Sequence, residues 1–311
     1  MAITIHPPPG GSGCGQVVSG PRLPAWLRRS LPTSPTYGRT QALLRELNLH
    51  TVCESARCPN HWECWSRGTA TFMIGGDRCT RACAFCAVTT ARPYPLDPDE
   101  PRRVAEATRR LQLRHVVITA VARDDLSDGG AHHFRRTIEA VRALNPGIVV
   151  EVLTPDFNGQ EASVATVLSG QPDIFNHNLE TVRRLTPQVR HRATYDRSLT
   201  VLAMARRLSG GRVITKSGLM LGLGETPNEV LEALEDLRRV DCEIVTLGQY
   251  LRPTLAHLPV VEYLSPERFA WYGEQARAMG FRHVASAPMV RSSYHADDFR
   301  LSPASGTHCG S

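Results

Sequence analysis

The stretch Cys79-Thr80-Arg81-Ala82-Cys83-Ala84-Phe85-Cys86 places three cysteines in C-x3-C-x2-C spacing just after an apolar run. A second triplet, Cys53-x4-Cys58-x5-Cys64, precedes it, so six of the nine cysteines of this 311-residue chain lie within residues 53–86. Three thiolates can hold three irons of a cubic [4Fe–4S] cluster, which leaves the fourth iron for another ligand. The two triplets therefore predict two clusters, each with one iron open to a ligand other than cysteine.

Structural zinc and disulfide bridges are the alternative interpretations of these cysteines. Zinc prefers four closed ligands, usually in C-x2-C pairs, and neither triplet has this form, although His50 or His61 would complete the first. Two odd-numbered groups do not favour disulfides, and nothing in the sequence indicates export. The second triplet thus favours iron–sulfur binding, and the first alone leaves the choice open. Ordinary thiols are expected at Cys14, Cys242 and Cys309.

The basic residues are almost all arginines. Lys216 is the one lysine among 36 Lys and Arg residues, which leaves 35 arginines, and the formal net charge is +6. Nucleic-acid binders are also basic, but acidic residues are interspersed here and we find neither an arginine block nor a helix-turn-helix pattern. No apolar run approaches the roughly 20 residues that span a bilayer. We therefore expect neither a nucleic-acid nor a membrane partner.

The ends of the chain differ in composition from its middle. Residues 1–25 are rich in Pro, Gly and Ser, and no acidic residue precedes Glu46, which raises the question of a transit peptide. Pro7-Pro8-Pro9 is a poor start for a targeting helix and a secretory apolar region is absent, so a cytoplasmic location is expected. The predicted divisions are a flexible arm, an auxiliary-cluster extension, a barrel and a C-terminal segment with a loose tail, at residues 1–40, 41–66, 67–285 and 286–311.

Between the ends, strand-like runs alternate with helical patterns. The apolar, β-branched runs lie at residues 69–74, 115–121, 148–153, 173–175, 213–221 and 243–247. Alternating strands and helices predict a parallel sheet. About six βα units are too few for a closed eight-stranded barrel. The predicted fold is α/β, a partial (β/α)6 TIM-type barrel with N- and C-terminal extensions.

Several helix boundaries are marked by capping residues. Helical patterns cover residues 131–144 and 196–208. Thr226-Pro227-Asn228-Glu229 is typical of a capping box and predicts a helix to about Val240. Ser265-Pro266-Glu267 predicts another helix start, with Gly280 as its C-terminal stop.

The second cysteine triplet, with Phe85 before its last cysteine, resembles the signature of radical S-adenosylmethionine (SAM) enzymes. Together with the first triplet and Arg291-Ser292-Ser293-Tyr294, it is similar to the lipoyl synthase family in particular. The resemblance runs nearly from end to end, from about Trp26 to Ala296. Further matching motifs are Cys58-Pro59-Asn60, Glu63-Cys64-Trp65, Arg123-Asp124-Asp125-Leu126, Asp128-Gly129-Gly130-Ala131, Pro155-Asp156-Phe157, Asn176-His177-Asn178 and Gly248-Gln249-Tyr250-Leu251.

The resemblance implies a SAM site at the carboxyl ends of the barrel strands, where parallel barrels gather their reactive groups. Cys79, Cys83 and Cys86 would hold the cluster that binds SAM. Gly218-x-Met220-x-Gly222-x-x-Glu225 resembles the element on which radical SAM enzymes rest the adenine. The other candidate SAM contacts are Phe85, Asn176, Asn178, Glu180 and Lys216, the last because a site needing a point charge would not accept arginine.

Acidic residues beyond the second strand are candidates for contact with the cofactor amine or the substrate. These are Asp124, Asp125 and Asp128, and the alternative for them is a solvated, helix-capping loop.

In the lipoyl synthase pattern, Ser293 completes the auxiliary cluster held by Cys53, Cys58 and Cys64. Oxygen is a harder and weaker partner than thiolate for such an iron, so a displaceable ligand suits a cluster that must open. Cofactors implied are thus two [4Fe–4S] clusters and SAM. Cys79, Cys83, Cys86 and Ser293 are the residues predicted to take part in catalysis.

The implied reaction inserts two sulfur atoms, at C6 and C8 of a protein-bound octanoyl group, with the auxiliary cluster as sulfur donor. Implied partners are an octanoylated lipoyl carrier domain, from a 2-oxoacid dehydrogenase E2 or the glycine-cleavage H protein, and a reductant such as flavodoxin or ferredoxin. The alternatives are another radical SAM sulfur-insertion enzyme, or an iron–sulfur or zinc regulator that binds nucleic acid.

Overall fold

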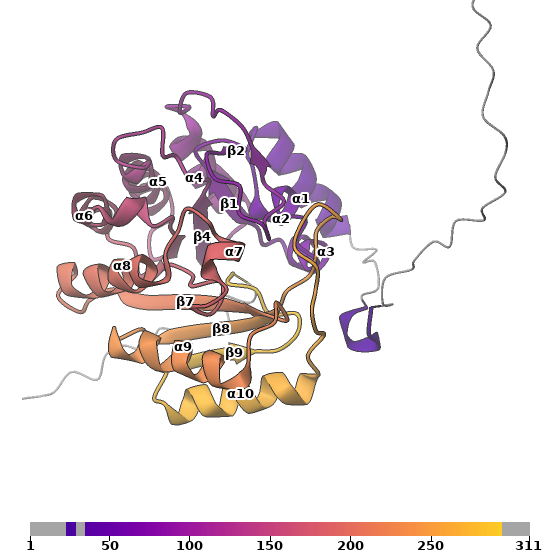
Figure 1. Ribbon diagram of the computed structural model, residues 1–311. Coiled ribbons are helices and arrows are strands. Elements are labelled where there is room, and N and C mark those ends of the chain that lie inside the picture. The colour runs from indigo at the N-terminus through magenta and orange to yellow at the C-terminus, as the bar shows by residue number, and fades with distance from the viewer. Residues whose placement is uncertain (1–22, 29–34, 294–311) are drawn as a thin grey trace, which may run out of the picture.

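The computed structural model of the chain describes residues 23–28 and 35–293 (Figure 1). Most of the predicted arm and tail, including Cys14, Tyr294 and Cys309, lies outside the described residues. None of the helices in these two ranges is long and apolar enough to cross a membrane. The cytoplasmic location stays a prediction.

Seven parallel strands form one sheet in which each strand lies next to its predecessor in the chain. Their order is β1-β4-β5-β6-β7-β8-β9, so β1 and β9 are the two edges. A separate parallel pair, β2 (Arg78–Cys79) and β3 (Thr89–Thr90), closes the second cysteine loop. The strands of the main sheet are β1 (Thr71–Ile74), β4 (His115–Ala120), β5 (Val149–Leu153), β6 (Ile174–Asn176), β7 (Ile214–Leu221), β8 (Ile244–Gln249) and β9 (His283–Ser286).

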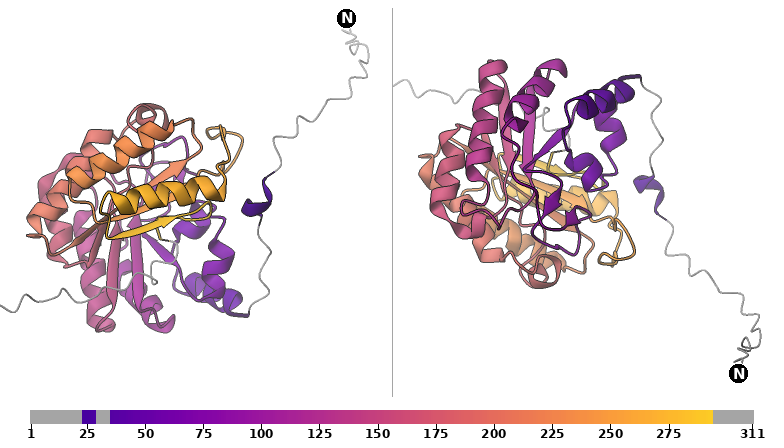
Figure 2. Two further views of the ribbon diagram at one scale, coloured as in Figure 1. Left: turned by 90° about the horizontal axis from the view of Figure 1, so that it is seen from below. Right: turned by 90° about the horizontal axis from the view of Figure 1, so that it is seen from above.

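One main helix follows each of the first six strands of the sheet and lies on its outer face (Figures 1 and 2). The predicted partial barrel of six βα units is therefore confirmed, with β9 as one further strand. These helices are α4 (Glu100–Arg110), α5 (Ala131–Leu144), α6 (Glu161–Ser169), α8 (Tyr195–Leu208), α9 (Pro227–Arg239) and α10 (Pro266–Ala278). The smaller helices are η1 (Ala25–Leu27), α1 (Pro35–Glu46), α2 (Val52–Ser55), α3 (His61–Ser66), η2 (Phe157–Gly159) and α7 (Thr186–Val189).

The predicted helix signals are present in the structure. Thr226 and Glu229 form the reciprocal capping box of α9. Ser265 caps α10 by accepting a hydrogen bond from the Arg268 N–H, and Gly280 follows that helix with φ +87°. Gly280 therefore adopts the left-handed conformation that is common at the residue following a helix.

The sequence analysis did not predict strand β9 or the start of helix α1. Strand β9 is only four residues long and half-buried, so it lacks the fully apolar run that marks the other strands. Helix α1 begins at Pro35, inside the range predicted as an arm. Its Thr40 is buried and donates a hydrogen bond to the Trp65 carbonyl of α3, 3.1 Å away. This contact orders residues whose composition alone suggested a loose segment.

Along each strand, successive side chains point alternately to the helices and to the interior of the barrel. On β5, Val150 and Val152 are fully buried against the helices, whereas Glu151 and Leu153 have the opposite orientation. The helix side is therefore mainly apolar, although it also buries the pair of His133 on α5 and Glu100 on α4.

The open side of the barrel is bridged by segments from both ends of the described chain. Residues before α2 pair with the free edge of β1, where the Met73 N–H bonds to the His50 carbonyl at 2.9 Å. The segment after β9 lies against β8, since the Gln249 N–H bonds to the Pro288 carbonyl at 3.1 Å. A Cβ added to Gly248 would lie 2.0 Å from the Val290 carbonyl oxygen, so only glycine permits this approach.

We expect Gly248→Ala to lower the free energy of unfolding by about 1–3 kcal/mol, because the backbone of β8 or of the C-terminal segment must shift. Thermal or urea unfolding measures the change. Gly38→Ala is the matched control: Gly38 is exposed on α1 with nothing within 4 Å of its Cβ position, so that change should be neutral or stabilising. Equal stability of the two variants would contradict the close packing at Gly248.

Candidate active site

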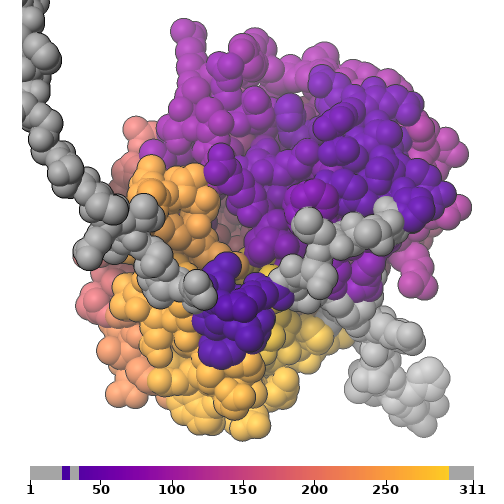
Figure 3. Space-filling model, turned by 90° about the vertical axis from the view of Figure 1, so that its right-hand side faces the viewer, coloured from indigo at the N-terminus to yellow at the C-terminus, as the bar shows by residue number. Residues whose placement is uncertain are grey.

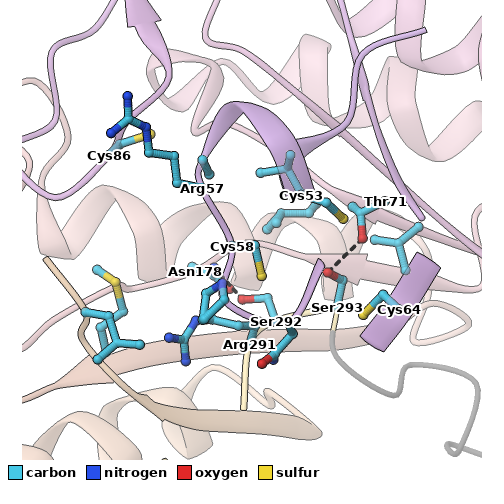
Figure 4. A pocket seen from close by; sticks show the side chains of 18 of the residues that line it. Cys53, Arg57, Cys58, Cys64, Thr71, Cys86, Asn178, Arg291, Ser292 and Ser293 are labelled. Atoms are coloured by element: carbon cyan, nitrogen blue, oxygen red, sulfur yellow. Dashed lines mark hydrogen bonds between the residues drawn. The ribbon is translucent and has the colours of Figure 1, made fainter. Parts of the chain in front are cut away.

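One cavity of about 360 Å³ is lined by cysteines from both triplets (Figure 4). Cys53, Cys58 and Cys64 lie on its wall, and so does Cys86 from the second triplet. The cavity extends from the start of β1 and β4 to the carboxyl ends of β7 and β8, inside the barrel. The fold therefore brings the two predicted cluster sites to one space.

The first triplet is held by two short helices. Cys53 lies on α2 and is buried, Cys64 lies on α3, and Cys58 is in the connection between them. The Cys58 N–H bonds to the Cys53 carbonyl at 3.0 Å. The Cys64 carbonyl accepts bonds from both the backbone and the hydroxyl of Thr69, which tie α3 to the start of β1. All three thiols are thereby fixed relative to the sheet.

The second triplet lies in the loop after β1. Gly75 and Gly76 turn the chain with φ of +79° and +95°, and the pairing of β2 with β3 closes the loop at Cys79. The Ala84 N–H bonds to the Val189 carbonyl at 3.0 Å, so the middle of the loop is tied to α7. These contacts place the loop at the carboxyl end of the sheet, as predicted.

Arg81, between the cysteines of this loop, is its main polar anchor. It makes a bidentate ion pair with Asp124, at 2.6 and 2.8 Å, and contacts Asp156 at 2.8 Å. Burial alone would raise the pKa of Asp156, but Arg81 lowers it to about 2. Asp124 therefore anchors the loop, while Asp125 pairs with Arg123.

The predicted alternative of a capping role applies to the third acidic residue. Asp128 accepts hydrogen bonds from the backbone N–H groups of Gly130 and His132 at the start of α5.

Burial disfavours ionisation of five of the six thiols in the two triplets. It raises the pKa of Cys53, Cys64 and Cys86 to about 12, and neighbouring cysteines add to the effect. The pKa values of Cys58 and Cys83 are raised in the same direction. Metals bind the thiolate, so cations must replace these protons. Buried thiols gathered in two groups of three fit the ligands of iron–sulfur clusters.

The triplets do not by themselves form a closed zinc site. Structural zinc takes four ligands, and within residues 23–28 and 35–293 no group of three or more His, Cys, Asp or Glu side chains is arranged to hold one metal ion. The thiols of each triplet nevertheless influence one another electrostatically, so they lie near one another.

The C-terminal segment carries two serines into the cavity. Thr71 on β1 donates a hydrogen bond to Ser293 Oγ at 2.8 Å, and Asn178 donates one to Ser292 Oγ at 2.7 Å (Figure 4). Asn60 Nδ2 bonds to the Met289 carbonyl, at 2.6 Å. These bonds place Ser293 in the same cavity wall as the first triplet.

Arg291 is half-buried beside Cys58. Burial lowers the pKa of its guanidinium, whereas Cys58 raises it. The guanidinium also bonds to the carbonyl of the preceding residue, Val290, 2.6 Å away.

Three of the predicted SAM contacts line the cavity: Phe85, Asn178 and Glu180. Asn178 Nδ2 bonds to Glu180 Oε1 at 3.0 Å, and burial raises the pKa of Glu180. The Asn178 Oδ1 atom is buried without a hydrogen-bond partner among the described residues. It is an acceptor available to a ligand.

Asn176 and Lys216 are not on the cavity wall but contact a buried carboxylate. Both donate to Glu151 Oε1, at 3.0 and 2.8 Å, and His115 Nε2 lies 3.2 Å from the other oxygen. Burial alone would raise the pKa of Glu151, but Lys216 and His115 lower it to about 2. The lone lysine of the chain thus neutralises a charge inside the barrel.

The remaining predicted SAM contacts also lie off the cavity wall and shape the end of β7. Glu225 accepts bonds from the N–H groups of Gly222, at 2.5 Å, and Leu223, at 2.9 Å. Gly222 has φ +102°, and an added Cβ would lie 2.2 Å from Gln249 Nε2. A Cβ on Gly218 would lie 2.6 Å from Thr246 Oγ1. Adenine contact by this element stays a prediction.

Several residues of the site were not predicted from the sequence. Glu151 and His115 sit alone in apolar strand runs, and an isolated charge in a buried strand is the signal that marks them. Thr71 and Arg57 carry no such signal, because only the cavity brings them to the cysteines.

Comparison with known proteins agrees with this geometry. Residues 73–237 match the Radical SAM superfamily, and residues 15–58 match the N-terminal domain of lipoyl synthase of that family. The lipoyl synthase of Thermus thermophilus is 57% identical over 276 residues, covering 88% of this chain and 85% of its own length. That of Caldanaerobacter subterraneus is 55% identical over 276 residues, covering 89% and 96%.

The fold and the matched region make this chain a member of the Radical SAM superfamily, which implies a [4Fe–4S] cluster and SAM. A solved structure of methylornithine synthase shares the fold, with a TM-score of 0.54 at 13% identity over 81% of this chain and 82% of that one. Within the superfamily, the chain belongs to the lipoyl synthase family. The resemblance drawn from its motifs is thus confirmed.

The buried carboxylate predicts how stability depends on pH. The pKa of Glu151 is lower in the folded state than its ordinary 4.5, so its stabilisation is present above about pH 4.5 and is lost as the pH falls toward 2. In Glu151→Gln, the decrease in the free energy of unfolding on acidification should be smaller by on the order of 2–3 kcal/mol. It should also destabilise the neutral protein, since Lys216 loses its counter-charge.

Urea unfolding of the iron-free chain between pH 2 and pH 7 measures both effects. Glu139→Gln, at an exposed position of α5, is the control and should keep the original pH profile. If Glu151→Gln lost stability on acidification as the original chain does, the ion pair between Glu151 and Lys216 would be contradicted.

Proposed function

We propose that this chain is a lipoyl synthase that inserts two sulfur atoms, at C6 and C8 of an octanoyl group carried by a protein. The observation that carries the proposal is the single cavity lined by Cys53, Cys58, Cys64, Cys86 and Ser293. An enzyme that activates a carbon at one centre and supplies sulfur from another needs both within reach of one substrate chain.

The residues divide into two ligand sets. Cys79, Cys83 and Cys86 would hold the cluster that binds SAM, and the first triplet with Ser293 would hold the auxiliary cluster. When bound, these groups would supply the electron that splits SAM and the sulfur that enters the product. The protein contributes placement of the two centres and exclusion of water.

The chain's own side chains would orient SAM and the acyl group. Asn178 and Glu180 offer amide and carboxylate oxygens to the cofactor from the end of β6. Val117, Leu153 and Met220 give the wall an apolar surface that suits a hydrocarbon chain. The apolar part of the wall would help to keep water from reactive carbon.

Ser293 is the residue best placed to give a weak ligand. Its hydroxyl accepts a bond from Thr71, which fixes the oxygen toward the first triplet (Figure 4). A neutral or alkoxide oxygen binds iron less strongly than thiolate does, so this corner can be vacated when the cluster gives up sulfur.

The substrate would be an octanoylated carrier domain, of an E2 subunit or of the glycine-cleavage H protein. A flavodoxin or ferredoxin would provide electrons, and the reaction would take place in the cytoplasm. No observation on the described residues favours the alternative of a nucleic-acid-binding regulator. The test is anaerobic incubation with SAM, a reductant and an octanoyl-lysine peptide, with mass spectrometry of the peptide. Failure to form a lipoyl product would overturn the proposal.

Removing one ligand from each set should separate the two centres. We expect the reconstituted chain to hold about eight irons, and Cys83→Ala and Cys58→Ala to hold about four each. Cys83→Ala should abolish SAM cleavage, whereas Cys58→Ala should retain it. Iron and sulfide analysis, with deoxyadenosine quantified by chromatography, measures both. Deoxyadenosine production by Cys83→Ala would contradict the assignment.

Ser293→Ala should keep SAM cleavage near the original rate and lower the yield of lipoyl product by at least about tenfold. The reason is that the auxiliary site loses its oxygen ligand while the SAM site keeps all three cysteines. Ser169→Ala, an exposed serine at the end of α6, serves as control. Full product yield from Ser293→Ala would remove this residue from the mechanism.

A further inference from the structure

The most exposed large apolar side chain of the described residues is Leu255, with 86% of its surface accessible. It lies in the loop of residues 251–258, between β8 and α10 (Figure 1). Single exposed leucines are common on protein surfaces and need no explanation by themselves. Two further properties of this loop, its rigidity and its place beside the cavity, set Leu255 apart.

The loop is held in one conformation by its own hydrogen bonds. Arg252 donates to the His257 carbonyl at 2.8 Å and to the Leu255 carbonyl. The Thr254 hydroxyl bonds to His257 Nδ1 at 2.8 Å, and the Ala256 N–H bonds to Thr254 Oγ1 at 3.2 Å. Leu255 is therefore displayed on a braced turn, so little conformational entropy would be lost when a partner covers it.

The same loop forms part of the cavity and contacts the second cysteine loop. Leu251, Arg252 and Pro253 lie on the cavity wall. On the other side, His257 Nε2 bonds to the Cys86 carbonyl at 3.0 Å. The Leu258 N–H bonds to the Ala84 carbonyl at 3.1 Å. A partner that touches Leu255 would thus lie directly beside the cavity that receives the substrate.

The cavity wall carries an excess of positive charge. It includes four arginines against two carboxylates: Arg57, Arg67, Arg252 and Arg291, with Glu63 and Glu180. Arg57 is exposed and has φ +52°, and its guanidinium makes no hydrogen bond or ion pair within the described part of the chain, although its backbone N–H bonds to the Glu54 carbonyl. Arg252 is exposed as well. Charge complementarity therefore favours a partner with an acidic surface.

The cavity volume determines which part of a carrier-bound substrate can enter. About 360 Å³ suits a small ligand such as an acyl chain but not a folded domain. The domain that carries the acyl group must stay outside and rest on the rim. Figure 3 shows the face on which the N-terminal extension, in purple, meets the C-terminal half, in orange and yellow.

We propose that residues 251–258 are the docking surface for the acyl-carrying domain, with Leu255 as its apolar anchor and Arg57 and Arg252 facing acidic side chains of that domain. This inference rests on the proposed function. The loop joins docking to catalysis, because the segment that bears the anchor is bonded to the backbone of Cys86 and Ala84.

The test uses the anaerobically reconstituted chain and octanoylated glycine-cleavage H protein as the probe, with the dissociation constant measured by calorimetry. Leu255→Asp should weaken binding by about tenfold or more, as removal of an interface anchor does. Leu144→Asp, at another exposed leucine, on α5, is the matched control and should bind as the original chain does. Arg57→Gln should reduce the salt dependence of the affinity.

A second measurement separates the docking surface from the reaction itself. Leu255→Asp should convert a short octanoyl-lysine peptide at the original rate, since the peptide has no domain to dock. Circular dichroism and iron content verify that the variant is folded and loaded. If the original chain fails to convert the peptide, the proposed function fails, whatever the binding data show.

Three outcomes would overturn the docking proposal while leaving the proposed function intact. One is a dissociation constant for Leu255→Asp within twofold of the original. Another is equal loss of turnover on peptide and on H protein, which would mean that Leu255 acts on the site itself. The third is a concentration-dependent dimer of the original chain, seen by sedimentation and abolished by Leu255→Asp, which would assign the surface to a second copy.

Discussion

The structure depends on a sheet that has too few strands to close. Seven parallel strands leave β1 and β9 as edges, and exposed edges need cover. Two segments provide this cover, one before the barrel in the chain and one after it. Residues 50–51 pair with β1, and the segment after β9 crosses from β8 toward β1. The covering segments carry Cys53–Cys64 and Ser293, so the segments that cover the open barrel also bring these side chains to one cavity wall.

Charge burial is the second constraint, and the chain meets it in two ways. Permanent charges inside the barrel are paired, as with Glu151 and Lys216 or Arg81 and Asp124. Such pairs offset a desolvation cost that neither partner could bear alone. The thiols of Cys53 and Cys86 differ, because burial raises their pKa values. The paired charges stabilise the fold, whereas the cysteine thiols remain available to bind metal cations.

Much of the fold was predictable because its signals are local. Six strand runs, the capping box at Thr226 and the helix start at Ser265 all depend on neighbouring residues. Strand β9 and the first turn of α1 were missed because their order comes from distant contacts, such as Thr40 with Trp65. In the site, cysteine spacing indicated the ligand sets, but the sequence held no sign that Thr71 would bond to Ser293, 222 positions away.

The sequence by itself indicated which atoms could bind metal. The indication came from two thiol triplets, a serine motif near the end of the chain and a family resemblance. Only the tertiary structure decided the geometry. It placed the first triplet and Cys86 of the second on one cavity, paired Lys216 with Glu151 inside the barrel, and displayed Leu255 on a braced loop beside Cys86. The reason is physical. Ligand preference is a property of each side chain, whereas proximity, burial and pairing arise only when segments far apart in the chain pack together.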